Sequence, residues 1–329
     1  MTAARIAALA LLVPITVIAA LAVGGAQIPP DRLVSALLHP HHADDVTTIV
    51  WTLRLPRVAI AAFVGASLAL AGTLMQALLR NPLVDPYLTG ISSGAGASVA
   101  IAVVLGVAAP LLTPLGFASG LATAVLVATL ARRGSGLDRE RLILAGVSIS
   151  ALLAAVVTLA LMKLTRDFAA QTLLAWLAGS LAGHGWSDLA AAAPEALLGL
   201  IVGTLAIPAL NVLRVGESRA ATLGVDVVRL QWLLLVAATL LTAAAVALAG
   251  LVGFVGLIVP HLARRVVGQD LRAVVPAAAL AGASLLIVAD ALARTLAAPA
   301  EIPLGVLLAF VGVPTFLVLY LRGAARAYA

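Results

Sequence analysis

Asp290 and Arg294 stand out as candidates for chemistry because both lie within an apolar stretch, LLIVADALARTLA. An ionisable residue inside a membrane crossing marks a functional site by default. Asp290 could therefore serve a secondary transporter or an intramembrane enzyme. The four-residue spacing also puts both side chains on one helix face, where they can simply neutralise each other. The sequence leaves these two interpretations equal.

Other catalytic signatures are missing from the sequence. It has no GxxxxGK[ST] loop for ATP phosphates, no HExxH pair for zinc and no cysteine. Ser92 and Ser93 have no base nearby, so they are not predicted to be nucleophiles. His261 follows Pro260 near a helix end and is interpreted as a capping or packing residue. We therefore expect no catalytic residue and no bound cofactor or metal on this chain.

A histidine-rich loop is the nearest approach to a metal site. His39, His41 and His42 precede Asp44 and Asp45, and these side chains could bind a metal weakly. A solvated loop is the favoured interpretation, because the spacing matches no compact set of metal ligands.

One polar segment is the best candidate for contact with another protein. It contains Gly216, Glu217, Ser218, Arg219, Ala220, Leu223 and Gly224. Its first three residues are typical of a helix start, with the acid in the first turn where the helix dipole favours it. Its final glycine is suited to ending the helix. A short helix with a small apolar face could insert into a groove on a partner, and a structured loop without a partner is the equal alternative.

The elements that position these residues are predicted to be membrane-spanning helices. The chain is 63% hydrophobic and 10% charged, with a mean hydropathy of +1.16, whereas soluble domains carry about 25% charged residues. The net charge of +6 is spread over short loops, which indicates a topological role and no nucleic-acid binding. No linker divides the chain. We expect an all-α polytopic membrane protein with a single transmembrane domain over residues 1–329.

Apolar runs between polar, proline and glycine breaks predict ten crossings. They lie near 4–26, 56–79, 90–109, 112–132, 141–163, 187–212, 230–250, 252–267, 274–297 and 304–322. Residues 166–183 are predicted to form a short helix on the outer surface. The first run is interpreted as an uncleaved crossing, because it is long for the apolar region of a signal peptide.

An even number of crossings puts both termini on one side of the membrane. That side would hold 14 of the 20 basic residues: Arg5, Arg80, Arg132, Arg133, Arg139, Arg141, Arg214, Arg219, Arg229, Arg264, Arg265, Arg272, Arg322 and Arg326. The other six are Arg32, Arg54, Arg57, Lys163, Arg166 and Arg294. This imbalance predicts cytoplasmic termini.

Small residues recur in four segments: GASLALAG at 65–72, GISSGAGAS at 90–98, GLVGFVG at 250–256 and AGAS at 281–284. Small side chains let helices approach closely in lipid, where the hydrophobic effect provides no drive for helix association. We therefore expect most of these residues to serve helix packing.

The ordered motifs of this chain resemble those of the FecCD family, the permease subunits of ABC importers for iron–siderophores, haem and cobalamin. The resemblance rests on RLPR at 54–57, MQALLRNPLVDPYLTGISSGA at 75–95, LILAGV at 142–147 and WLAGSL at 176–181. It continues through GESRAATLG at 216–224, GFVGLIVPHLAR at 253–264, AGASLLIVADALAR at 281–294 and EIPLGVLLAFVGVPTF at 301–316. It therefore covers most of the chain.

The resemblance implies a fold of ten helices, the type II ABC importer permease fold, and roles for several residues. Gly216 to Gly224 match helices that seat on the ATPase. Arg54, Arg57 and Arg294 match outward arginines that receive acidic residues of a binding protein. A second set matches the cytoplasmic gate: Asn81, Arg139 and Glu140. The charged pair at 139–140 departs from the small polar residues expected there.

The resemblance also implies an assembly in the bacterial cytoplasmic (inner) membrane. The permease would be a homodimer with two cytoplasmic ABC ATPase subunits, which hold the ATP and Mg²⁺, and with a periplasmic or lipid-anchored substrate-binding protein. This chain would not itself be an enzyme. Its cargo would be a metal chelate, either an iron–siderophore or haem, with cobalamin as a further candidate. A secondary transporter or intramembrane enzyme using Asp290 is the alternative from another class.

Overall fold

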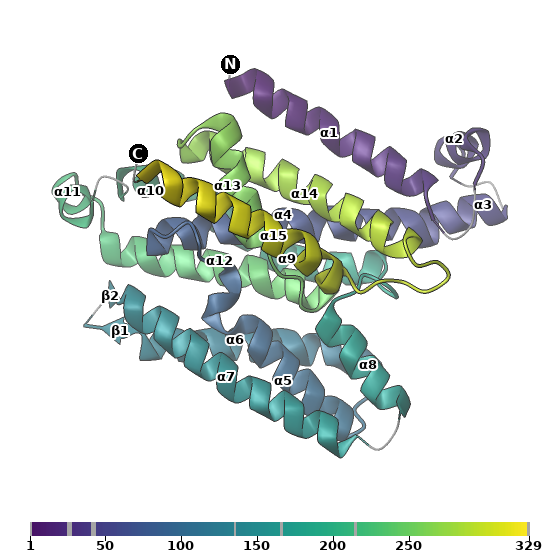
Figure 1. Cartoon of the computed structure of the whole chain (residues 1–329), viewed down its shortest axis with the longest axis horizontal. Helices are drawn as coiled ribbons and strands as arrows, with labels where there is room; N and C mark the ends of the chain where they lie inside the picture. The colour runs from purple at the N-terminus through teal and green to yellow at the C-terminus, as the bar shows by residue number, and fades with distance from the viewer. Residues whose placement is uncertain are drawn as a thin grey trace.

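The computed structural model describes residues 2–24, 28–40, 44–134, 136–164, 167–213 and 216–327. His41, His42, Arg166 and Arg214 lie outside the described residues, and so do the side chains of Arg322 and Arg326. The described chain is almost wholly helical (Figure 1). The predicted all-α class is confirmed.

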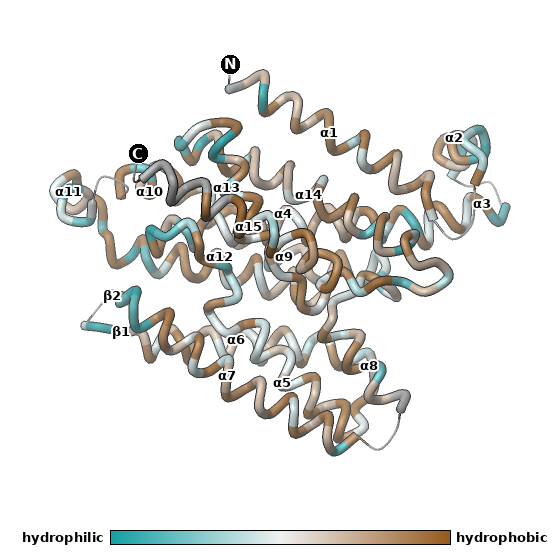
Figure 2. The backbone as a smooth tube through the Cα atoms, in the orientation of Figure 1, coloured by the Kyte–Doolittle hydropathy of each residue, from teal (hydrophilic) through white to brown (hydrophobic). Residues whose placement is uncertain are grey.

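The long helices run roughly side by side (Figure 1). They are α1 (Thr2–Ala22), α4 (Leu55–Leu79), α5 (Ile91–Val104), α6 (Leu112–Leu130), α7 (Arg139–Lys163), α9 (Trp186–Leu205), α12 (Val227–Ala249), α13 (Val255–Val267), α14 (Leu271–Thr295) and α15 (Leu304–Ala327). The polar residues gather mainly at helix ends and the apolar residues between them (Figure 2). This distribution suits a bundle that crosses a membrane.

Short elements connect the long helices. They are α2 (Pro30–Leu38), α3 (Asp45–Thr48), a π-helix (Ile49–Arg54), two 3₁₀ turns (Pro86–Thr89 and Ala109–Leu111), α8 (Asp167–Ala178), α10 (Ile207–Leu213) and α11 (Glu217–Thr222). Strands β1 (Arg132–Arg133) and β2 (Gly136–Leu137) form an antiparallel hairpin that pairs Arg132 with Leu137. The helix predicted within 166–183 is α8.

Seven helices of the described chain are long and apolar enough to cross a membrane. Each of the ten predicted crossings contains a helix of the described chain, but α5, α13 and α15 are not among these seven. Helix α5 has 14 residues and α13 has 13, against about 20 for a full crossing. Left-handed residues stop both helices early: Gly90 and Gly106 flank α5, and Phe254 precedes α13. In α15 the described side chains run unbroken only over Leu304–Val318.

Two further boundaries differ from the prediction. The segment predicted as 187–212 is divided at Ala206 into α9 and α10. The second crossing is longer than predicted, because α3, the π-helix and α4 continue without a break from Asp45 to Leu79. The extension places Arg54 and Arg57 within a continuous helix.

The centre of the bundle is formed by α4, α12 and α14, with α1 against α14 and α9 against α12. Helices α5, α6, α7 and α8 make a second group beside them (Figure 1). In the most apolar stretch of the second crossing, 78% of the residues are buried, and the share is the same in α12. In the most apolar stretch of α7, only 11% of the residues are buried. Helix α7 therefore leaves a long apolar face for lipid or another subunit.

The two ends of the bundle carry different elements (Figure 1). Both chain termini lie at the end that carries α10, α11 and the β-hairpin, which we call the terminal end. Helices α2 and α3 and the loop after α14 lie at the opposite end. The prediction that both termini share one side agrees with this arrangement.

Candidate functional site

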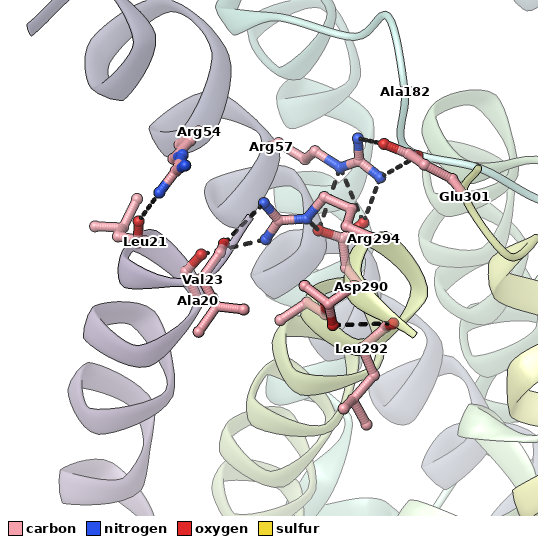
Figure 3. Close-up of polar contacts among 12 residues, drawn as sticks. Ala20, Leu21, Val23, Arg54, Arg57, Ala182, Asp290, Leu292, Arg294 and Glu301 are labelled. Atoms are coloured by element: carbon pink, nitrogen blue, oxygen red, sulfur yellow. Dashed lines mark hydrogen bonds and ion pairs between the residues drawn. The ribbon is translucent and has the colours of Figure 1, made fainter. Parts of the chain in front are cut away.

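Four charged side chains form a cluster at the opposite end (Figure 3). We call Arg57, Asp290, Arg294 and Glu301 the ion cluster. The Arg57 guanidinium donates to both oxygens of Glu301 at 2.9 and 2.8 Å, and its Nε donates to Asp290 Oδ1 at 3.0 Å. Arg294 Nε lies 3.0 Å from Asp290 Oδ2. Asp290, which is 2% exposed, is thus shared by two arginines.

Arg54 and Arg294 also hold the end of α1. Arg54 donates to the carbonyl of Leu21 and is buried. Arg294 donates to the carbonyls of Ala20 and Val23 at 3.3 and 3.4 Å. The last carbonyls of a helix lack partners within the helix, so cations are favoured there. The two arginines therefore hold α1 against the π-helix that precedes α4 and against α14 (Figure 3).

These contacts favour the neutralising interpretation of Asp290. Its carboxylate is neutralised by Arg294 as the spacing allowed, and by Arg57 from a distant part of the sequence. A buried carboxylate between two guanidiniums is a structural ion pair, since removing either partner would leave an uncompensated charge. Arg54, Arg57 and Arg294 come together at one end of the bundle, as the docking prediction requires, but each already has a partner in this chain.

Glu301 is the member of the ion cluster that the sequence reasoning missed. It stands in the loop before α15, and 41% of its side chain is exposed. The Arg57 guanidinium holds the pKa of the Glu301 carboxyl below its usual value. The sequence did contain a signal for Glu301, because this acid stands in a loop on the side predicted to hold Arg54, Arg57 and Arg294.

Helix α11 lies at the terminal end and has the predicted boundaries. Gly216 precedes it at φ 116° and Gly224 follows it at φ 83°, both left-handed values that favour glycine. The N–H of Val225 donates to Ala220 O at 3.0 Å and closes the helix. Ala220 is fully buried against the chain, whereas Leu223 is 68% exposed. The large apolar side chain exposed at the end of α11 is therefore Leu223.

Glu217 connects α11 to two other helices. Its carboxylate accepts a hydrogen bond from Arg139 at the start of α7, and lies 3.7 Å from Arg80 at the end of α4. We call Arg80, Arg139 and Glu217 the inner bridge. Arg80 also donates to Leu213 O at 3.0 Å. The inner bridge thus joins a predicted partner-contact residue, Glu217, to a predicted gate residue, Arg139.

The three predicted gate residues have different surroundings. Arg139 belongs to the inner bridge, and Glu140 is exposed in the first turn of α7. Asn81 follows the left-handed Arg80, and its Oδ1 accepts from Leu83 N at 2.9 Å. Its side chain therefore caps the turn after α4. Of the three, Arg139 is the one that forms an ion pair with α11 among the described residues.

A cavity of about 460 Å³ is lined by the turn before α5, the first turn of α5, α7 and the start of α13. Asp85, Ser92, Ser93 and Ser150 contribute polar groups to its wall. The Asp85 carboxylate accepts from the backbone N–H groups of Tyr87 and Phe254. Burial raises the pKa of Asp85 to about 6.

We expect Asp85→Asn to raise the thermal unfolding midpoint by a few degrees at pH 7.5 and to have no effect near pH 4. The folded protein holds the Asp85 proton more tightly than the unfolded chain, so wild-type stability falls as the pH rises from the unfolded pKa to about 6. Asparagine keeps an acceptor oxygen without the charge. Melting curves from pH 4 to 8 test this. Asp226→Asn, at the exposed N-cap of α12, is the control; an equal, pH-independent effect of both substitutions would contradict the prediction.

No group of three or more His, Asp or Glu side chains that could hold a metal occurs within the described ranges. His41 and His42, from the histidine-rich loop, are not among them.

The family model described as "FecCD transport family" matches residues 11–322. This chain belongs to the FecCD transport family. FecCD proteins are transport permeases, so the secondary transporter and the intramembrane enzyme are set aside.

Relatives of this FecCD chain agree along most of its length. The hemin transport system permease of Yersinia pestis is 42% identical over 92% of both chains. The cobalamin import system permease of Halobacterium salinarum is 39% identical over 82% of this chain and 73% of its own. A solved structure, described as an inward-facing conformation of a metal-chelate type ABC transporter, shares 31% identity with a TM-score of 0.85. The alignment covers 98% of this chain and all of that one. The type II ABC importer permease fold is confirmed.

Proposed function

We propose that this FecCD permease imports a metal chelate, an iron–siderophore or haem, with cobalamin as a further candidate. The full-length similarity to a metal-chelate type transporter carries the proposal, together with the haem and cobalamin permeases among the relatives. Ser92, Ser93 and Ser150 line the cavity with small hydroxyls. Such a lining suits passage of an amphiphilic chelate, because weak contacts allow release.

The permease works as a homodimer in the bacterial inner membrane, with two ABC ATPase subunits at the terminal end. The exposed apolar face of α7 and the exposed Leu223, which directly follows α11, support these contacts. The basic residues at the terminal end make it the cytoplasmic end by the positive-inside rule. A substrate-binding protein docks at the opposite end, over the ion cluster. ATP and Mg²⁺ belong to the ATPase subunits.

Reconstitution in proteoliposomes tests this function. The permease, its genomically neighbouring ATPase and its binding protein should take up a labelled ferric siderophore, haem or cobalamin only when ATP is enclosed with the ATPase. Native mass spectrometry of the same complex should give two permease chains. Uptake driven by an ion gradient without ATP, or a stable complex with one permease chain, would overturn the proposal.

We expect Arg57→Gln to weaken docking of the binding protein about tenfold, and Glu301→Gln to strengthen it. Arg57 is paired with the partly exposed Glu301, so an acidic side chain of the binding protein would compete with Glu301 for the guanidinium. A bidentate arginine–carboxylate pair at an interface contributes more binding free energy than the roughly 0–1 kcal/mol of an exposed pair. Arg54 and Arg294 are poorer test positions, because they hold α1. Arg57 also pairs with Asp290, so the thermal midpoint of the Arg57→Gln variant is measured beside its affinity; Arg294 still pairs with the Asp290 carboxylate in that variant.

Affinities of both variants are measured from about 50 to 500 mM salt, over which the Debye length falls roughly threefold. Arg32→Gln, on the exposed face of α2 at the same end, is the matched control. Docking that is unchanged in both variants at every salt concentration would contradict the role of Arg57.

A further inference from the structure

A second cavity, of about 470 Å³, lies at the terminal end between the last turn of α4, the second half of α13 and the start of α14. We call it the basic pocket. Arg80, Arg264 and Arg265 line it together with His261, Gln76 and Asn81. None of its lining residues is acidic. The pocket thus gathers three guanidiniums and no carboxylate on its wall, and one of the three, Arg80, also lies 3.7 Å from Glu217 in the inner bridge.

Hydrogen bonds fix one of these guanidiniums. Gln76 is buried, and its Nε2 donates to the carbonyls of Val84, Gly256 and Leu257 at 3.1–3.3 Å. Its Oε1 therefore has a set direction and accepts from Arg264 Nη1 at 2.5 Å. This arrangement places Arg264 at the pocket wall before any ligand arrives, which reduces the entropy lost on binding.

Two other groups at the wall lack partners among the described residues. His261 Nε2 is buried and makes no hydrogen bond there, and a buried polar atom without a partner costs free energy. Arg265 is exposed and makes neither a hydrogen bond nor an ion pair with the described chain. A ligand with several oxygens could satisfy both groups and bridge them to Arg264.

We propose that the basic pocket binds a phosphate-bearing anion, either the headgroup phosphate of an anionic phospholipid or soluble phosphate. Guanidiniums bind phosphate through paired hydrogen bonds, and basic pockets between transmembrane helices bind anionic headgroups on the cytoplasmic side. A phosphate presents more acceptor oxygens than a single carboxylate from a partner protein. Donors from α4 and α13 can therefore surround it.

The test titrates the full-length permease in neutral detergent with phosphatidylglycerol, phosphatidylcholine or inorganic phosphate, and reads the thermal midpoint. Phosphatidylglycerol or inorganic phosphate should raise the midpoint, while zwitterionic phosphatidylcholine should not. Stabilisation by phosphatidylglycerol alone assigns a lipid site, and stabilisation by phosphate as well assigns a site for the free anion. Arg265→Gln should weaken the binding about tenfold, the effect of losing one charge-assisted hydrogen bond.

Arg229→Gln supplies the control, because Arg229 is exposed, lies outside the pocket and carries the same charge. His261→Asn is the second pocket variant and should also weaken binding. Equal loss in the Arg229→Gln and Arg265→Gln variants would overturn the site, since it would show attraction to surface charge in general. A second result would also overturn the anion site: neither phosphatidylglycerol nor inorganic phosphate raises the midpoint, and Arg265→Gln only weakens binding of the ATPase. The pocket would then be a contact surface for that protein.

Discussion

Gly72→Ala should abolish the folded permease, because α4 and α13 touch through their backbones at this residue. A Cβ on Gly72 would lie 1.9 Å from the carbonyl oxygen of Gly256 and 2.5 Å from its carbon. Backbone atoms within packed helices cannot rotate away as a side chain can. Overpacking in soluble cores costs about 1–3 kcal/mol, and we expect more here. Detergent-solubilised yield and size-exclusion profile measure the loss.

Gly253→Ala is the matched control for this substitution. Gly253 stands just before α13 and has no left-handed φ, and a Cβ added there would have no neighbouring atom within 4 Å. The variant should give wild-type yield and elution. A Gly72→Ala variant that elutes and melts like wild type would show that α4 and α13 can separate without loss of the fold.

Glu217→Arg should leave the permease folded and reduce its stimulation of the ATPase at least about tenfold. Helix α11 is short and lies at the end of the bundle, so the membrane core does not depend on it. The substitution removes the acceptor of the inner bridge and puts a third cation beside Arg80 and Arg139. Repulsion should displace α11 from α7 and α4. The free-energy cost of losing the ion pair and of adding a like charge is together larger than the roughly 1.4 kcal/mol that corresponds to a tenfold change.

A charge exchange separates the inner bridge from general loss of charge. Arg139→Glu combined with Glu217→Arg should recover part of the ATPase stimulation, because the pair is rebuilt in reverse. Arg141→Glu, at an exposed position near the start of α7, is the control and should behave like wild type. If the single Glu217→Arg variant stimulates ATP hydrolysis normally, α11 does not transmit the signal.

Local rules made several features predictable from the sequence. Apolar length fixed the membrane-helix class, because a helix in lipid must satisfy its own backbone. The boundaries of α11 followed from Gly216, Glu217 and Gly224, since an acid in the first turn and a left-handed glycine after the end act within a few residues. The small-residue segments were predicted to pack, and the structure pairs Gly65 with Gly282 and Gly72 with Gly256.

Tertiary structure alone decided which residues meet. Pairing of Asp290 with Arg294, four residues away, was one of two equal interpretations of the sequence, and its second partner, Arg57, is 233 residues away. Glu217 and Arg139, which are 78 residues apart, were assigned to different roles and proved to be one bridge. Glu301 lies in a loop, so no helix periodicity could predict its pairing with Arg57. Helix period and turn chemistry act over a few residues, whereas these contacts depend on the order in which α4, α7, α11 and α14 pack.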